Sequence, residues 1–373
     1  MTKDLPEGGF DVTDVTSGPW VISHVSRLWR EVSLNCSELW SCFYIQRDMD
    51  DYENWDKALF LNTALIRSGK RGLCIDYDCR FFMDGESWIH LESLMAHSHR
   101  WKHISLVLPE DMLEYTRQIR GSLGSLESLE IHMEPVRRGI TIDAFEFAPC
   151  LTCIKIVSRP AATRQEFIFP WSQLISYHEE LEQTRVDSMS ILLSLLEVVR
   201  KCMALENLTI PSFGPLDAAD DTSEVPYVTH STIRHLIAKS HSIIPFLTLP
   251  SLETLTLDLR VHTAPEATLD VHHLILRSDC SITELNLRGI TPGKEVVKLL
   301  RCTPKLTRLA FHYRYSQWKN NVNKDFICFF KEVGTATLIM STHTIERLQG
   351  FKEDGMHIFR AKMADSGQEI TYV

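Results

Sequence analysis

The amino-acid sequence predicts an α/β fold made of repeated units, a leucine-rich-repeat solenoid of horseshoe form with a short N-terminal helical segment. The chain has 373 residues, of which 44% are hydrophobic and 24% charged, a composition typical of a folded protein with a large core. The pattern L-x-x-L-x-L recurs in five clear copies, at Leu126–Ile131, Leu205–Ile210, Leu252–Leu257, Ile282–Leu287 and Leu306–Phe311. Weaker copies bring the number to nine, with central apolar positions 19 to 31 residues apart, close to the period of about 20 to 29 residues known for such repeats.

The first expected element is one amphipathic helix that begins at Pro19, a residue suited to a first helical position. It is followed by an apolar turn at Leu39-Trp40. The helix would present one apolar stripe, formed by Ile22, Val25, Trp29 and Val32 with Leu28 beside it. We expect two parts in the chain, an N-terminal segment of residues 1–50 and a degenerate repeat domain of residues 51–373.

Within the repeat domain, helices are expected to connect the strands. A helix from Asn54 to Gly69 would pack Trp55, Leu59 and Ile66 before a first strand at Leu73–Tyr77. Further helices are expected over residues 110–121, over residues 188–201 with Asp187 as the N-cap, and over residues 323–334.

In a strand of the form L-x-x-L-x-L the leucines face the core, and strand alternation turns their neighbours to the concave face. The residues predicted to form this partner-binding face are Ser128, Glu130, His132, Cys153, Lys155, Val157, Asn207, Thr209, Thr254, Thr256, Asp258, Glu284, Asn286, Arg288, Arg308, Ala310 and His312. We single out Glu130, Lys155, Thr256, Asp258, Asn286, Arg288, Arg308 and His312 as the residues that would meet a polar protein surface. The alternative is a ladder of cross-strand pairs in which these charges neutralise one another.

Several segments resemble those of the large fungal family of F-box and leucine-rich-repeat proteins. They are PWVISHVSRLWREVSL and ELWS near the N-terminus, then ALIRSGKRGLCID, LPSLETLTL, LLRCTPKLTRL and FKEDGMHI, so that the resemblance runs over nearly the whole chain. It implies a protein–protein interaction adaptor: the F-box holds a Skp-type protein of a cullin ubiquitin ligase, and the repeats act as the substrate receptor. The residues to examine for adaptor binding are Val25, Leu28, Trp29 and Val32, which would otherwise pack the helix on the first repeat.

The sequence departs from the family at its start. An F-box opens with a helix that begins Leu-Pro, but Pro6, Gly8 and Gly9 disfavour a stable helix before Pro19. The N-terminus is thus expected either to be incomplete or to belong to a protein that has lost its adaptor. The second interpretation predicts a repeat scaffold or decoy that binds protein but no ligase.

The remaining features favour binding over chemistry. No catalytic, phosphate-binding or metal-binding motif is present, so we expect no enzyme activity, no cofactor and no metal. A net charge of −10 is opposite to what a nucleic acid requires. No apolar stretch reaches the roughly 20 residues of a membrane span, and no secretory signal begins the chain, so we expect a cytoplasmic or nuclear protein that does not bind membranes.

Overall fold

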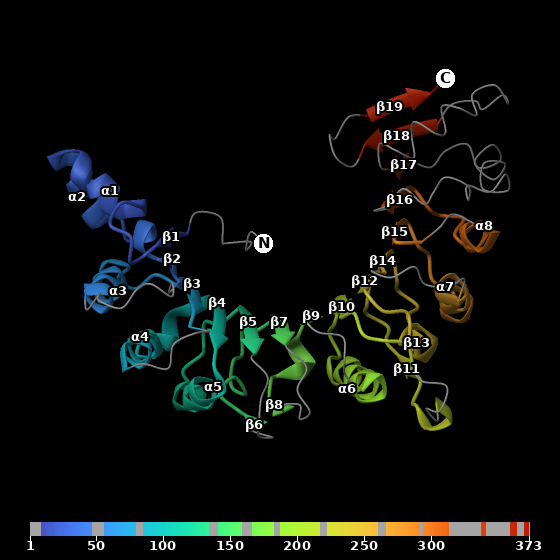
Figure 1. Cartoon of the computed structure of the whole chain (residues 1–373), viewed down its shortest axis with the longest axis horizontal. Coiled ribbons are helices and arrows are strands. Elements are labelled where there is room, and N and C mark those ends of the chain that lie inside the picture. Colours follow the sequence, from blue (N-terminus) through green and yellow to red (C-terminus); the bar gives the residue numbers. More distant parts are fainter. Residues whose placement is uncertain are drawn as a thin grey trace. The chain divides into compact units, whose positions relative to one another are not determined.

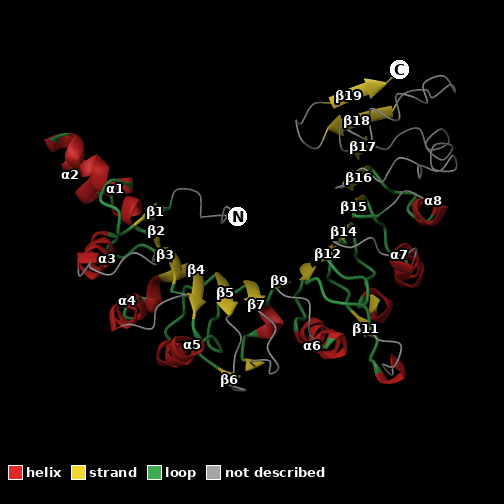
Figure 2. Ribbon diagram, in the orientation of Figure 1, coloured by secondary structure: helices red, strands yellow, loops and turns green. Residues whose placement is uncertain are grey.

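The protein has an α/β fold in which parallel strands alternate with helices (Figures 1 and 2). The computed structural model describes residues 9–46, 56–79, 85–133, 141–158, 166–182, 187–216, 222–259, 266–290, 294–312, 337–340, 359–363 and 369–372. The chain divides into two compact units. Unit 1 holds residues 1–174 with 179–183, and unit 2 holds residues 175–178 with 184–373.

In unit 1 the parallel strands follow one another in chain order, and the helices lie on one side of them (Figure 1). The strands of its sheet are β1 (Phe10–Asp11), β2 (Cys42–Gln46), β3 (Leu73–Asp78), β4 (Trp101–Leu108), β5 (Ser128–Met133) and β7 (Cys153–Ser158). Its α-helices are α1 (Gly18–Val25), α2 (Arg27–Asn35), α3 (Asp56–Arg67), α4 (Gly85–Met95) and α5 (Glu110–Tyr115). Short 3-10 turns are η1 (Ser37–Trp40), η2 (Ser98–Arg100), η3 (Thr116–Ile119) and η4 (Trp171–Gln173), and β6 (Thr141–Ile142) pairs with β8 (Glu166–Phe167).

Unit 2 repeats this arrangement. Its strands are the first half of β9 (Ser176–Leu181), then β10 (Asn207–Ile210), β12 (His235–Ala238), β14 (Thr254–Asp258), β15 (Glu284–Arg288), β16 (Arg308–His312), β17 (Thr337–Met340), β18 (Phe359–Met363) and β19 (Glu369–Tyr372). All of them pair parallel except β19, which is antiparallel to β18. The helices are α6 (Ser188–Lys201), α7 (Glu266–Ser278) and α8 (Lys294–Arg301), with turns η5 (Thr222–Glu224) and η6 (Ile244–Phe246) and a small pair of β11 (Val228–Thr229) with β13 (Leu247–Thr248).

The predicted repeat frames pair in register. In unit 2 each central apolar residue is the direct partner of the next, from Tyr177 through Leu208, Leu236, Leu255 and Leu285 to Leu309. In unit 1 the same ladder runs from Ile75 through Ile104 and Leu129 to Ile154. All ten strands predicted from the pattern are therefore confirmed, and within each unit they pair in one alignment.

The leucines of these frames form the core. Leu129, Leu255 and Leu285 have no exposed surface, and Leu208 and Leu309 have 1%. The backbone N–H just before each of β10, β12, β14, β15 and β16 donates to the carbonyl just before the preceding strand, as Arg234 does to Glu206 and Glu253 does to Arg234, both at 2.9 Å. Each repeat is therefore fixed to its neighbour by both side-chain burial and backbone hydrogen bonds.

The prediction of one continuous helix from Pro19 is wrong. The backbone is extended at Ser26 (φ −161°, ψ 171°), where α1 ends and α2 begins. Ser26 Oγ accepts the backbone N–H of Trp29 at 3.3 Å and so caps α2, which replaces the hydrogen bond that a continuous helix would have supplied. The apolar stripe predicted over residues 22–32 is divided between two helices.

The expected buried face of the next helix is also wrong. In α3 the buried apolar residues are Leu61, Ala64 and Leu65, whereas Leu59 is 61% exposed and Ile66 is 76% exposed. The predicted helix over residues 110–121 is shorter, because α5 tightens into η3 after Tyr115. The helix capped by Asp187 is confirmed, with the Asp187 carboxylate accepting from Met189 N at 3.1 Å. The helix expected over residues 323–334 and Trp55 lie outside the described residues.

Candidate protein-interaction surfaces

The N-terminal segment is held to the first strands by aromatic side chains. Trp20 Nε1 donates to the Val12 carbonyl at 3.2 Å, and its ring meets the buried Trp40 ring edge-on at 4.7 Å between centroids. The Arg67 guanidinium lies over both rings, 4.5 Å from that of Trp40 and 5.2 Å from that of Trp20, an arrangement that favours a cation–π interaction. Burial lowers the pKa of Arg67. These contacts fix α1 against α3 and the 3-10 turn η1.

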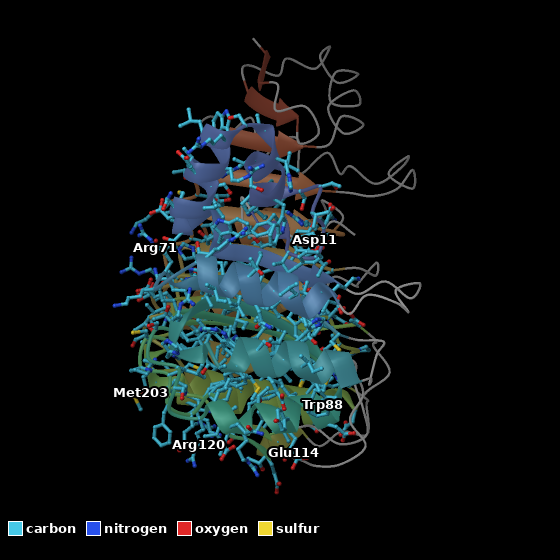
Figure 3. The ribbon with its side chains drawn as sticks, turned by 90° about the vertical axis from the view of Figure 1, so that its left-hand side faces the viewer. Asp11, Arg71, Trp88, Glu114, Arg120 and Met203 are labelled. Carbon is cyan, nitrogen blue, oxygen red and sulfur yellow. The ribbon has the colours of Figure 1, made fainter. Side chains whose placement is uncertain are left out.

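Polar contacts complete this anchor. Ser33 Oγ on α2 donates to the Pro19 carbonyl at 3.0 Å, and Trp40 Nε1 donates to the Ser33 carbonyl at 2.7 Å. Arg71, labelled in Figure 3, pairs with Glu38 Oε1 at 2.7 Å. The side chains that fasten α1 and α2 are therefore different from those predicted to bind an adaptor.

The predicted adaptor-binding residues all face solvent. Their exposed fractions are 65% for Val25, 68% for Leu28, 51% for Trp29 and 44% for Val32. Seven of the eighteen large apolar side chains that are exposed in the described part of the chain lie between Val15 and Leu34. We call Val25, Leu28, Trp29 and Val32 the N-terminal apolar set. About half or more of the surface of each of these side chains is therefore open to solvent.

On the strands of unit 1, three of the predicted partner-binding residues form one hydrogen-bonded group, the Glu130 cluster. Lys155 Nζ lies 2.8 Å and His132 Nε2 lies 2.6 Å from Glu130 Oε1. Burial raises the pKa of the Glu130 carboxyl, but the hydrogen bonds from His132 and Lys155 outweigh it and lower the pKa to about 2. Glu130 and Lys155 are direct partners on β5 and β7, so the cluster is a cross-strand pair joined by a neighbouring histidine.

Unit 2 carries a second group of cross-strand contacts, which we call the unit-2 polar strip: Thr256, Asp258, Glu284, Asn286, Arg288 and Arg308. Arg288 Nη1 lies 3.5 Å from Asp258 Oδ2, and Arg308 Nη1 lies 3.4 Å from Glu284 Oε1. Asn286 Nδ2 donates to Thr256 Oγ1 at 3.2 Å and to Glu284 Oε1 at 3.1 Å. This is the self-neutralising ladder that we set against a binding surface, although the arginine side chains stay about half exposed.

Not every predicted surface residue is at the surface. Val157 and Ala310 are buried, with 5% and 2% exposure, and Thr209 is nearly so at 7%. Strand alternation places Val157 away from the leucines, but it is buried beside His132, its register partner on β5, as is Val107 on the other side of His132. His312 on β16 is in register with Arg288 on β15, and its side chain lies outside the described part.

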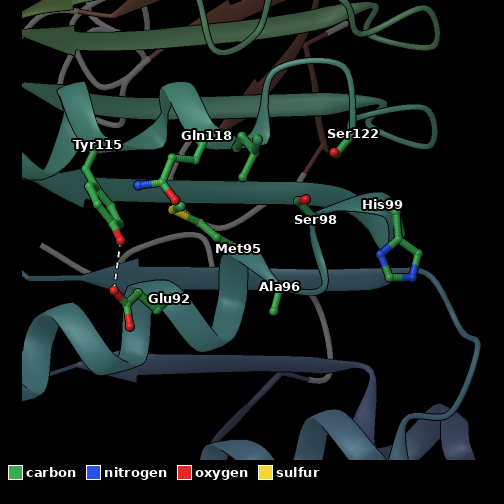
Figure 4. A pocket seen from close by; sticks show the side chains of 9 residues that line it. Glu92, Met95, Ala96, Ser98, His99, Tyr115, Gln118 and Ser122 are labelled. Carbon is green, nitrogen blue, oxygen red and sulfur yellow. Dashed lines mark hydrogen bonds between the residues drawn. The ribbon is translucent and has the colours of Figure 1, made fainter.

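A pocket of about 440 Å³ lies in unit 1, between α4 and the α5–η3 segment (Figure 4). Glu92 and Tyr115 close one end, where the Tyr115 O–H donates to Glu92 Oε1 at 2.8 Å. None of the lining residues belongs to the N-terminal apolar set or the Glu130 cluster. Among the described residues, no three His, Cys, Asp or Glu side chains gather to hold a metal ion.

Two features of unit 1 were not predicted from the sequence. Cys42–Gln46 forms the strand β2, which brings Cys42 opposite Cys74 on β3. Its apolar and aromatic run, CFYIQ, is typical of a strand, but we had placed it inside the N-terminal segment. The position of Arg67 over two tryptophans has no signal in the sequence.

Comparison with known proteins assigns no family to the chain. No protein-family model matches the chain, and no curated protein matches it in sequence. No described helix has the length and apolar character that crossing a membrane requires.

Proposed function

We propose that the chain is a protein-recognition adaptor, the substrate receptor of a Skp-cullin-F-box type ubiquitin ligase, built as a leucine-rich-repeat solenoid with a partial F-box at its N-terminus. Strands of one sequence pattern, paired in one register and alternating with helices, support the repeat assignment. The proposal assigns the N-terminal apolar set to the adaptor and the polar side of the strands to the substrate.

The observation that carries the proposal is the exposure of the N-terminal apolar set. Soluble proteins seldom leave apolar side chains gathered in this way without a partner that covers them. Trp29 and Leu28 are large, and aromatic and aliphatic anchors of this kind contribute much of the energy at protein interfaces. They lie on α2, which holds its position through Ser33 rather than through the apolar set itself.

The polar side of the strands suits a different kind of partner. The unit-2 polar strip offers exposed guanidinium groups at Arg288 and Arg308 beside the carboxylates of Asp258 and Glu284. Contacts between a mixed-charge surface and its partner favour specificity over raw affinity. A substrate with its own mixed charges would exchange these internal pairs for intermolecular ones.

The test is a binding assay between the full-length chain and the Skp-type adaptor from the same cell. Point variants are preferable to removal of the N-terminal segment, because that segment includes β2, whose loss would uncover β3. We expect Leu28→Asp or Trp29→Ala to weaken binding by at least about tenfold, as for an interface anchor. Leu276→Asp, on a leucine of α7 with similar exposure (58%), is the matched control and should leave binding unchanged.

Absence of saturable binding by the folded full-length chain would overturn the ligase assignment. It would favour the second candidate, a repeat scaffold that binds protein without a ligase. One observation supports that candidate: Phe10–Asp11 forms the strand β1, paired with β2, in the region where an F-box would have its first helix.

A further inference from the structure

Unit 1 holds two cysteines side by side on adjacent strands. Cys42 on β2 and Cys74 on β3 are direct register partners. Parallel strands lie about 4.8 Å apart, which falls within the range of about 4.4 to 6.8 Å between Cα atoms that a disulfide spans. Their neighbours Phe43 and Ile75 are buried, so alternation turns both thiols to the opposite, partly exposed side of the strands.

The two thiols also interact with each other. They share a hydrogen bond, which lowers the pKa of Cys74 and raises that of Cys42. Burial and the Glu127 carboxylate act against the change at Cys74, and the nearby Lys102 ammonium supports it. Lys102 is held at this place by an ion pair with Glu127, 2.9 Å from Nζ to Oε1. Lys102 thus lies where its charge favours a thiolate at Cys74 rather than at Cys42.

No other pairing in the described strands joins two cysteines. Cys153 lies on the same side of the sheet, in register with Ser128 on β5, and β4 and β5 separate it from Cys74. Cys202 is fully buried, and this burial raises its pKa to about 12. Among the cysteines of the described strands, Cys42 and Cys74 are therefore the ones placed to react together.

We propose that Cys42 and Cys74 form a site of oxidative modification that reacts with small hydroperoxides and closes to a disulfide between β2 and β3. With hydrogen peroxide, the Cys74 thiolate attacks one oxygen, the O–O bond breaks, and Cys74 becomes a sulfenic acid. The other oxygen leaves as hydroxide, which takes up the proton that the Cys74 thiol released and becomes water. Cys42 then attacks the Cys74 sulfur, the S–O bond breaks, and the hydroxide leaves with the Cys42 proton as a second water. Hydrogen peroxide gains the two electrons that the dithiol loses.

The direct test exposes the reduced full-length chain to hydrogen peroxide, alkylates the remaining thiols and maps the peptides by mass spectrometry. We expect one linked peptide pair, Cys42 with Cys74, two hydrogens lighter than its reduced parts. During exposure to peroxide, the Cys42 and Cys74 thiols should become unavailable for alkylation roughly tenfold faster than the Cys153 thiol, since the reactive species is the thiolate. A dithiol reductant should restore them.

Three variants separate the roles. With Cys42→Ser, Cys74 should stop at the sulfenic acid, which dimedone traps. With Cys74→Ser, no linked pair should form, and Cys42 should react no faster than Cys153. Cys153→Ser is the matched control and should behave as the unaltered chain. Trapping of Cys42 instead of Cys74, or equal reaction rates in all variants, would overturn the assignment.

A second measurement tests the geometry without oxidation. Phenylarsine oxide joins two neighbouring thiols through arsenic and releases one water. The folded chain should bind one equivalent at this site, and Cys42→Ser and Cys74→Ser should each abolish that binding. A folded chain that binds none there would show that the two sulfurs do not approach. The site does not depend on the proposed ligase function, so either proposal can fail alone.

Discussion

Replacement of Glu130 by glutamine removes a charge from the middle of the unit-1 sheet without changing the size of the side chain. The carboxyl pKa falls from 4.5 to about 2 on folding, against the effect of burial, because His132 and Lys155 donate to it. A shift of this size corresponds to at most about 3 kcal/mol of stability. We expect about 2 kcal/mol, because Lys155 is about a third exposed and solvent screens its part.

The direction of the pKa shift determines how the stability changes with pH. The folded-state pKa is below the unfolded value, so the stabilisation is complete above pH 4.5 and is lost as the pH falls toward 2. The difference between Glu130 and Glu130→Gln should therefore be largest at pH 7 and should shrink below pH 4.5. Urea unfolding, with hydrogen exchange of the β5 amides as a local measure of unit 1, would follow it at each pH.

The control is Glu127→Gln, which removes a charge from the exposed pair with Lys102 in the same unit and should change stability much less. A Glu130→Gln variant as stable as the parent at pH 7 would refute the reasoning. So would a difference that is unchanged at pH 3, because the loss would then come from altered packing rather than from charge.

Two further predictions concern the repeat framework. Gly289→Ala should destabilise unit 2 by at least about 2 kcal/mol, because Gly289 has a φ of +77° and a Cβ there would meet the Leu259 carbonyl. Gly124→Ala, with open space around it, is the control. Equal melting temperatures for the two variants would contradict the expectation. Leu208→Ala should lower the free energy of unfolding by about 3 kcal/mol, because it leaves a cavity at a buried repeat position; urea unfolding measures this change. Ile237→Ala, at 39% exposure on the next strand, should lower it far less. Similar decreases for the two variants would argue against the core assignment.

Sequence predicted the strands of this fold better than its helices, for a physical reason. A strand of the pattern L-x-x-L-x-L must bury its leucines, and only one register lets Leu208, Leu255 and Leu285 stack on one another. The helix that begins at Pro19 had no such constraint. The break at Ser26 depends on the cap and on the contacts of Trp20 and Trp40, which sequence spacing does not reveal.

Some features of the candidate surfaces could be predicted from the sequence, and others depend on the assembled sheet. Strand alternation was enough to predict that Glu130, Lys155, Asp258 and Arg288 lie on the polar side of the strands. The pairing of Glu130 with Lys155 and of Asp258 with Arg288 follows from the register that the structure shows. The proximity of Cys42 and Cys74 also follows from register, but only once CFYIQ is taken as a strand. The burial of Val157 depended on its neighbours in adjacent strands, a property of the assembled sheet rather than of its own repeat.

The anchoring of the N-terminal segment bears on how the adaptor proposal can be tested. If Leu28 or Trp29 held α2 in place, a loss of binding on mutation would be ambiguous between a lost contact and a lost fold. In this chain α1 and α2 are instead fastened by Trp20, Ser33 and Arg67, while Leu28 and Trp29 remain more than half exposed. Mutation of an exposed side chain away from such anchors usually changes stability by less than about 0.5 kcal/mol. A variant such as Leu28→Asp should therefore keep its melting temperature, so that any loss of adaptor binding reports on the surface itself.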